Sequence, residues 1–142
     1  MSDEYQVRGI PSALIEKMWP FAEPYVKRAL DHTFGEIAPL DLKNGCLARD
    51  MQLWMAAKNS RVMGAGTTEI VLYPQMKVCR VITLAGTEFD AWRELALNII
   101  RNWALEQDCQ AMECYVRKGF VPKLQELGFK HKYSVCHLNI RE

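Results

Sequence analysis

The apolar residues of the chain follow two spacings, one typical of strands and one typical of helices. Four short runs rich in apolar and β-branched residues predict strands: 5–10, 51–58, 61–73 and 77–85. Asn59-Ser60 and Pro74-Gln75 are turn signals between the last three runs. These short connections predict three successive antiparallel strands in the middle of the chain.

Helical spacing is clearest over residues 88–106, where one predicted face carries Phe89, Trp92, Leu95, Ile99 and Trp103. Thr87, followed three residues later by Asp90, predicts a capping box at the start of this helix. Near the N-terminus, Ser12 is predicted to cap a first helix. A break is expected near Pro20, with a second helical piece through about Leu30, because proline disrupts a helix interior. A further short helix is expected within residues 31–45.

The C-terminal third predicts a strand over 109–116, a short helix over 120–127 stopped by Gly128, and a last strand over 129–140. A helix that connects two neighbouring strands implies a parallel pair, here between 77–85 and 109–116. The expected fold class is α/β (α+β). It is a mixed, mostly antiparallel sheet of six to seven strands flanked by about four helices, in one domain over 1–142.

Composition excludes several classes of protein. Lys and Arg total 18 and Asp and Glu total 17, so the net charge is +1 and specific nucleic-acid binding is not expected. No run approaches the about 20 apolar residues of a membrane span. Five cysteines without metal-ligand spacing, together with an N-terminus that lacks an apolar signal region, predict reduced thiols, no metal site and a cytoplasmic location.

Four stretches resemble the GNAT acetyltransferase superfamily, and in particular its branch encoded by tailed phages and prophages. They are Val62–Val71 (VMGAGTTEIV), Trp103–Glu106 (WALE), Val116–Phe120 (VRKGF) and Gly128-Phe129. The resemblance implies a GNAT-like fold, acetyl-CoA as donor and an amine as acceptor, either a small molecule or a protein. It also implies a host-cell cytoplasm or a virion as the location.

The resemblance assigns the CoA pyrophosphate to the turn before the long helix, where helix N–H groups can bind an anion. The matching residues are Leu84, Ala85, Gly86 and Thr87, with Arg117 and Lys118 as candidates for a CoA phosphate. Two features depart from the superfamily pattern. Glu88 and Asp90 place negative charge where a pyrophosphate would bind. Leu124 stands where many of these enzymes have a tyrosine that protonates the CoA thiolate.

Acetylation of an ammonium group needs a base, and two glutamates are candidates. Glu69 lies on the predicted strand 61–73. Glu113 lies on the next-to-last strand, where alternation puts it on one face with Tyr115 and Arg117. Tyr115, on this strand, and Tyr133, on the last predicted strand, are candidate general acids, and the alternative for each is an aromatic side chain packed against the sheet. The alternative for Glu113 is a solvated Glu–Arg pair, and Arg80 is predicted to pair with either glutamate.

Two function hypotheses follow. The first is a GNAT-like acyltransferase that uses acetyl-CoA and has a degenerate pyrophosphate loop. The second is a non-catalytic GNAT-like phage protein that acts on a host protein or as an internal virion component. A homo-oligomer formed by joining exposed sheet edges is compatible with both hypotheses.

Overall fold

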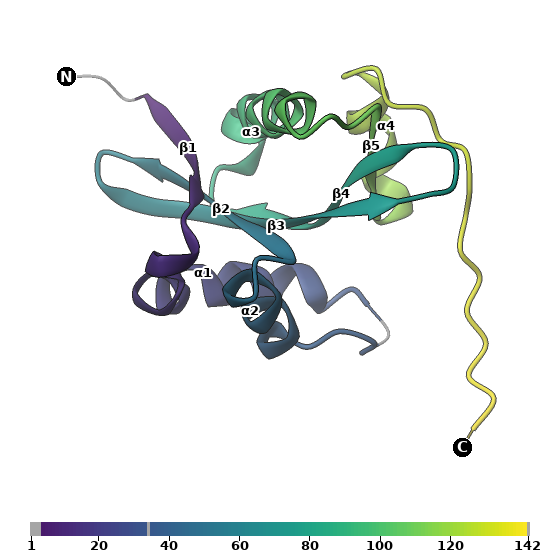
Figure 1. The fold of residues 1–142 in the computed structure, drawn as a ribbon, viewed down its shortest axis with the longest axis horizontal. Helices are drawn as coiled ribbons and strands as arrows, with labels where there is room; N and C mark the ends of the chain where they lie inside the picture. Colours follow the sequence, from purple (N-terminus) through teal and green to yellow (C-terminus); the bar gives the residue numbers. More distant parts are fainter. Residues whose placement is uncertain (1–3, 34, 142) are drawn as a thin grey trace.

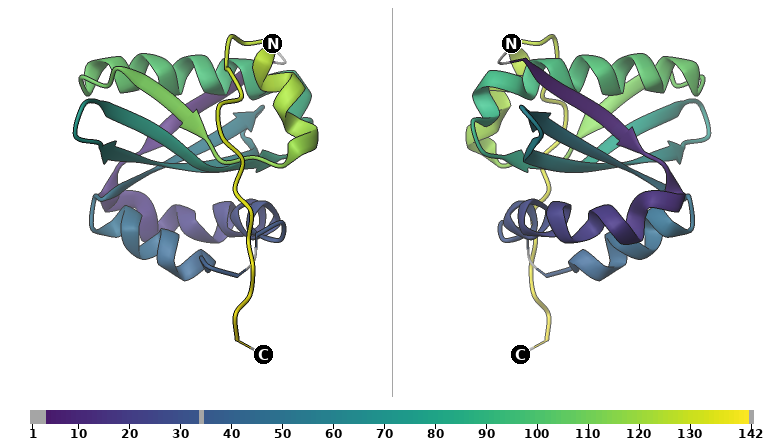
Figure 2. Two further views of the ribbon diagram at one scale, coloured as in Figure 1. Left: turned by 90° about the vertical axis from the view of Figure 1, so that its right-hand side faces the viewer. Right: turned by 90° about the vertical axis from the view of Figure 1, so that its left-hand side faces the viewer.

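The computed structural model describes residues 4–33 and 35–141. A central sheet separates two helical layers (Figure 1). On one face lie α1 (Ile15–Leu30) and α2 (Pro39–Leu47), and on the other lie α3 (Phe89–Glu106) and the short α4 (Val121–Gln125). Two further views, each turned by a right angle from the view of Figure 1, show the same three layers (Figure 2). The predicted mixed α/β class is confirmed.

The sheet contains five strands in the described chain, in the order β1-β2-β3-β4-β5. Their bounds are β1 Tyr5–Ile10, β2 Met51–Lys58, β3 Arg61–Leu72, β4 Lys77–Gly86 and β5 Ala111–Cys114. Strands β2, β3 and β4 pair antiparallel in succession, and β4 pairs with β5 in parallel, as the sequence predicts. Strand β1 pairs antiparallel with β2. Asn59 and Ser60 both have positive φ, which matches a tight hairpin turn at the predicted place.

Helix α1 runs unbroken through Pro20 and Pro24, so the predicted break near Pro20 is wrong. The reason is tertiary packing. A stripe of side chains on α1 is buried against the sheet: Ile15, Trp19, Ala22, Val26 and Leu30. Both prolines are exposed, so the carbonyls that lose their helical partners can be hydrated. The predicted N-cap is also wrong, because Ser12 begins a 3₁₀ turn (η1, Ser12–Leu14) and its side chain makes no capping hydrogen bond.

Trp92 of α3 anchors the opposite face of the sheet. Its ring packs over Gly64 of β3 and Gly86 of β4, which are register partners. A Cβ atom built on Gly64 would lie 2.4 Å from the ring, and one on Gly86 would lie 2.6 Å from it. Leu84 covers Gly66 in the same way, at 2.6 Å. The glycines at these three positions therefore make room for side chains of the core.

The C-terminal third departs most from the sequence prediction. The predicted strand 109–116 is a strand only over Ala111–Cys114, and the predicted helix is divided into η2 (Lys118–Phe120) and α4. Residues 129–140 form no strand, so the sheet of residues 4–33 and 35–141 has five strands, where six to seven were predicted. Alternation alone does not make a strand, because a strand needs an edge to pair with. This segment instead runs across the strand direction and ends beyond the layer of α1 and α2 (Figures 1 and 2).

Candidate functional site

Three strands bring a cluster of polar side chains together on one face of the sheet. Arg80 of β4 lies at its centre, with Glu69 of β3 and Glu113 of β5 as its register partners. Arg80 Nε donates to Glu113 Oε1 at 2.7 Å, and Arg80 Nη1 lies 3.3 Å from Glu69 Oε1. Arg80 therefore pairs with both glutamates, where the sequence predicted a pair with either one.

Two tyrosines complete this cluster. The Tyr73 hydroxyl donates to Glu113 at 3.0 Å and accepts from Arg80 Nη2 at 3.1 Å. The ring of Tyr115 lies under the Arg80 guanidinium, at 4.6 Å from its centroid. Tyr73 was missed by sequence reasoning, although it lies four residues after Glu69 and hence on the same face of a regular strand.

The electrostatics of the cluster favour a stable ion pair. Partial burial opposes the charge on Arg80, but hydrogen bonds to Glu113 and Tyr73 outweigh it and raise the pKa of the guanidinium. The side chains of Glu69, Arg80 and Glu113 are 28%, 20% and 30% exposed. Both carboxylates are already engaged by the guanidinium, so neither is a free group that faces an empty site. The arrangement is suited to holding three strands together and to presenting a fixed polar surface.

Next to the cluster, β4 and β5 separate. Their pairing ends at Val81 and Cys114, and from Thr83 to Gly86 β4 pairs only with β3. The register with β3 shifts here, because Thr67 pairs with Thr83 while Thr68 pairs with Val81. Ile82 is thus an extra residue, which increases the local twist of the strand. The resulting split between β4 and β5 opens beside Arg80 and Glu113.

The turn that the resemblance assigns to the CoA pyrophosphate is very short. Leu84, Ala85 and Gly86 belong to β4 and pair with β3, which leaves Thr87 and Glu88 to connect β4 with α3. The Thr87 N–H donates to the Met63 carbonyl at 2.7 Å. The predicted capping box of Thr87 and Asp90 is wrong, since Glu88 is the N-cap residue and no side chain caps this helix.

Both acids at the start of α3 are held by partners. Glu88 accepts from the Tyr5 hydroxyl and lies 3.5 Å from Lys58 Nζ; the hydrogen bond from Tyr5 is the main cause of its lowered pKa. Asp90 accepts from Lys123 at 3.1 Å and pairs with Arg93. The hydrogen bond from Lys123 is the main cause of the lowered pKa of Asp90. Both groups are therefore carboxylates at neutral pH.

Contacts between α3 and the segment around α4 cover the same helix end. Phe120 stacks on Phe89 with ring centroids 5.7 Å apart, and Lys123 links α4 to Asp90. Leu124 is buried in the core beneath α3, so the position of the usual tyrosine holds a packing residue. The predicted phosphate ligands Arg117 and Lys118 are exposed at the start of η2, and their role stays a prediction.

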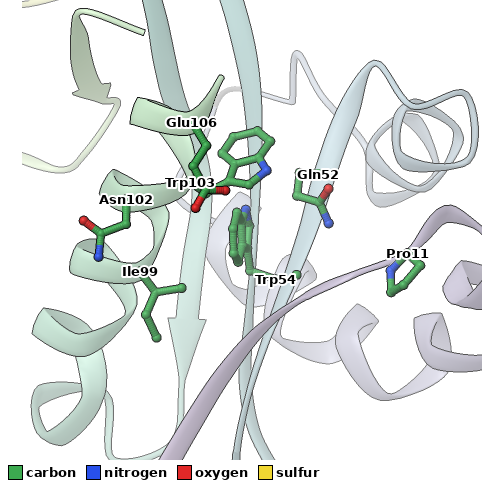
Figure 3. Close-up of a pocket in the computed structure, with 8 residues that line it drawn as sticks. Pro11, Gln52, Trp54, Ile99, Asn102, Trp103 and Glu106 are labelled. Carbon is green, nitrogen blue, oxygen red and sulfur yellow. The ribbon is translucent and has the colours of Figure 1, made fainter. Parts of the chain in front are cut away.

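A groove of 490 Å³ lies at the other side of the sheet, between α3 and strands β1 and β2 (Figure 3). Trp54 and Trp103 meet edge to face within it, with ring centroids 5.4 Å apart. Its polar groups are largely used by the fold: Trp54 Nε1 donates to Thr68 Oγ1 at 3.0 Å, and Gln52 Nε2 donates to the carbonyls of Ile10 and Leu53. The groove therefore has an apolar wall, and the polar side chains that remain along it are Asn102 and Glu106 of α3.

The five cysteines are free, and burial raises the pKa of Cys79 and Cys114 to about 12. No group of three or more His, Cys, Asp or Glu side chains in 4–33 and 35–141 is arranged to hold a metal ion. In the same part of the chain, no helix is both long enough and apolar enough to cross a membrane.

The order of strands and helices, with the split between β4 and β5, is that of the GNAT acetyltransferases. No family model matches the sequence, and no curated protein matches it significantly. Solved structures do match it. The aminoglycoside acetyltransferase meta-AAC0020 from an uncultured soil metagenomic sample, in complex with sisomicin, has a TM-score of 0.69 and 9% identity, over 96% of this chain and 97% of that chain.

Two further structures match to a similar extent. Aminoglycoside N-acetyltransferase AAC(6')-Iy in complex with CoA has a TM-score of 0.68 and 12% identity, over 99% of this chain and 97% of that chain. A putative acetyl transferase from Pyrococcus furiosus has a TM-score of 0.69 and 14% identity, over 96% and 100%. At such identities the likeness shows the fold, and the chain has the GNAT acetyltransferase fold.

The residues at the start of α3 do not fit a CoA pyrophosphate well. An anion site at a helix end needs free N–H groups and little competing negative charge. Here the Thr87 N–H is bonded to β3, Glu88 and Asp90 are carboxylates, and Phe120 stacks on Phe89 beside them. A role in binding the CoA pyrophosphate stays a prediction for the four residues of this turn: Leu84, Ala85, Gly86 and Thr87.

Proposed function

We propose that this chain is a non-catalytic GNAT-fold protein that acts through contacts with other proteins. The observation that carries the proposal is the two-residue connection between β4 and α3. It leaves no extended loop between the strand and the helix, the Thr87 N–H is already bonded to the Met63 carbonyl, and the carboxylates of Glu88 and Asp90 lie at the positive end of the helix. Negative charge at this end stabilises the helix but repels a pyrophosphate.

Two features of the chemistry support the same proposal. Leu124 replaces the residue that the resemblance would make the general acid, and it is buried in the core. The two candidate bases, Glu69 and Glu113, are both engaged by Arg80. The chain thus lacks a well-suited group for each of three tasks of an acetyltransferase: binding acetyl-CoA, protonating the CoA thiolate and removing a proton from the amine.

Exposed apolar side chains support a role in protein binding. Leu72 and Met76 at the tip of the β3–β4 hairpin are 76% and 45% exposed. Four side chains of the C-terminal segment are 80–90% exposed: Tyr133, Val135, Leu138 and Ile140. Groups of such residues commonly mark interaction surfaces. The sequence resembles GNAT-like proteins that phages and prophages encode. On that basis, the partner is a host protein in the cytoplasm or another protein of the virion.

Calorimetric titration with acetyl-CoA tests the proposal. We expect no heat of binding at millimolar ligand for the natural chain. A second titration uses the double variant Glu88→Gln and Asp90→Asn, which removes both negative charges while keeping the side-chain shapes. If charge is what excludes the donor, this variant binds acetyl-CoA measurably while the natural chain does not. Micromolar binding by the natural chain would overturn the proposal.

The acyltransferase remains the second candidate, because one observation favours it. The split between β4 and β5 opens immediately beside a cluster that contains Glu69, Glu113 and Tyr115. An amine acceptor is a cation at neutral pH, so the two carboxylates of this cluster would attract it. If the natural chain binds acetyl-CoA, turnover of model amines by Glu113→Gln and Glu69→Gln identifies the base. Unchanged turnover in both variants rejects these residues as bases.

A further inference from the structure

The groove of Figure 3 runs along the C-terminal half of α3, where Trp103 and Glu106 form part of one wall. Gly9 of β1 belongs to the opposite wall and is the register partner of Trp54. A Cβ atom built on Gly9 would lie 3.4 Å from the Trp54 ring and 3.2 Å from Gln52 Nε2. The groove therefore has room because β1 carries no side chain at this point, and its volume of 490 Å³ is typical of a ligand site.

Glu106 brings a carboxylate to this groove that the rest of the described chain does not neutralise. It follows Trp103 by three residues, so the two side chains are neighbours on the helix surface, and Figure 3 shows the Glu106 carboxylate beside the Trp103 ring. Over residues 4–33 and 35–141, Glu106 has no ion pair and no side-chain hydrogen bond. Glu88 and Asp90, at the other end of α3, each have such partners.

The position of Glu106 is unfavourable for the helix itself. Glu106 is the last residue of α3, and the last turn of this helix contains no basic residue. The C-terminal end of a helix carries a partial negative charge, which repels a carboxylate and attracts a cation. Helix stability therefore gives no reason for an acid at this place, whereas a cationic ligand would be attracted by both the carboxylate and the helix end.

Trp103 supplies an aromatic ring beside this negative charge. It is partly exposed, and its ring meets that of Trp54 edge to face, with 5.4 Å between the centroids. A cation over the face of an indole ring is attracted by its π electrons. A guanidinium suits such a place better than an ammonium, because it is planar, weakly hydrated and able to donate two parallel hydrogen bonds to one carboxylate.

We propose that the groove binds an arginine side chain of a partner protein. The guanidinium stacks on Trp103 and pairs with Glu106, and its aliphatic stem lies along Ile99, which precedes Trp103 by one helical turn. The proposal rests on the role in protein binding given above and names the chemical group that the partner presents. The site is separate from the Arg80 cluster, because Arg80 alternates along β4 with Val81, whose side chain packs beneath α3.

The charges along the groove favour an arginine within a protein chain over free arginine. No basic residue lines the groove within the described chain. The α-carboxylate of free arginine would therefore find no cation there and would be repelled by Glu106. In a protein chain the same carbonyl carbon belongs to a neutral peptide group, so this repulsion is absent.

NMR titration with a capped arginine, N-acetyl-arginine methylamide, tests the site. The chain has four tryptophans, so their indole N–H signals report on the groove and on two places elsewhere. The Trp103 signal is the one missing from the Trp103→Phe variant. We expect saturable shifts of the Trp103 and Trp54 signals at millimolar probe, and none of the Trp19 and Trp92 signals. No shift, or equal shifts of all four signals, would overturn the proposal.

Related probes separate the chemical groups. Capped citrulline has nearly the same shape as capped arginine but no charge, and it should cause no measurable shift. Capped lysine should bind more weakly than capped arginine, because its ammonium cannot stack or form two parallel hydrogen bonds. Equal binding of either compound would refute a guanidinium site. Tighter binding of free arginine or agmatine than of capped arginine would assign the groove to a small molecule and reject a protein partner.

Two variants test the residues. Glu106→Gln should weaken the binding of capped arginine by about threefold or more and leave the unfolding midpoint unchanged or higher, since its charge is unfavourable for the helix. Glu94→Gln is the matched control, because Glu94 is exposed on α3 and does not line the groove. Gly9→Val should abolish binding by filling the groove, with circular dichroism to confirm that the variant folds. Unchanged affinity in Glu106→Gln or in folded Gly9→Val, or equal weakening by Glu94→Gln, contradicts the proposal.

The two proposals fail in different experiments. Heat of binding with acetyl-CoA would overturn the non-catalytic role and leave the arginine site intact. Absence of shifts with capped arginine would overturn the arginine site and leave the non-catalytic role intact.

Discussion

Replacement of Gly86 by alanine tests whether this glycine serves packing or ligand binding. A Cβ atom on Gly86 would lie 2.3 Å from the Met63 carbonyl oxygen and 2.6 Å from Gly64 Cα. Both are backbone atoms of the neighbouring strand, so the clash cannot be relieved by rotating a side chain. A third contact, at 2.6 Å, is with the ring of Trp92, which is 1% exposed and has little room to move.

The expected cost follows from this geometry. Overpacking of a tight core typically costs about 1–3 kcal/mol, and the backbone contacts place Gly86→Ala near the upper end, at about 3 kcal/mol. With a urea m-value of about 2 kcal/mol/M, this lowers the unfolding midpoint by about 1.5 M. Urea titration followed by circular dichroism measures the change.

Gly119→Ala is the matched control. A Cβ atom on Gly119 meets no atom within 4 Å, so its free energy of unfolding should stay within about 0.5 kcal/mol of the natural chain. An unchanged midpoint for Gly86→Ala would refute the packing argument. If the natural chain binds acetyl-CoA and this variant does not, while its unfolding midpoint is unchanged, Gly86 belongs to the acetyl-CoA site.

Three further predictions concern charge and thiols. Arg80→Met should lower the free energy of unfolding at pH 7 by about 1–2 kcal/mol in urea titration, because it leaves two partly buried carboxylates without their partner. Arg101 is exposed, so Arg101→Met should lower the free energy of unfolding much less. An equal loss in both variants would contradict the reasoning. The lowered pKa of Glu88 means that its contribution to stability is complete above its ordinary value of 4.5 and is lost as the pH falls through the lowered value. The stability difference between the natural chain and Glu88→Gln should therefore shrink on acidification, and a constant difference from pH 7 to pH 3 would count against it. In the native protein, Ellman's reagent should modify the exposed Cys136 rapidly and the buried thiols, such as Cys79, only after unfolding; rapid modification of several thiols would show that the core opens easily.

Local pattern was sufficient for much of the fold. The helical face of 88–106 and the β-rich runs of the middle chain each specify an element from neighbouring residues alone. The turn at Asn59-Ser60 and the parallel pairing of β4 with β5 also follow from local signals and from rules of chain connection. The same holds for the grouping of Glu69, Arg80 and Glu113, because strand alternation and register put them on one face.

Other features depended on contacts between distant residues. Pro20 stays within a helix because the buried face of α1 outweighs the lost hydrogen bonds. The start of α3 uses Tyr5, Lys58 and Lys123 as partners for its acids, all of them far away in the sequence. Residues 129–140 have the composition of a strand but form no strand in the structure. Periodicity describes which face of an element is apolar, whereas only the assembled structure decides what that face, edge or charge meets.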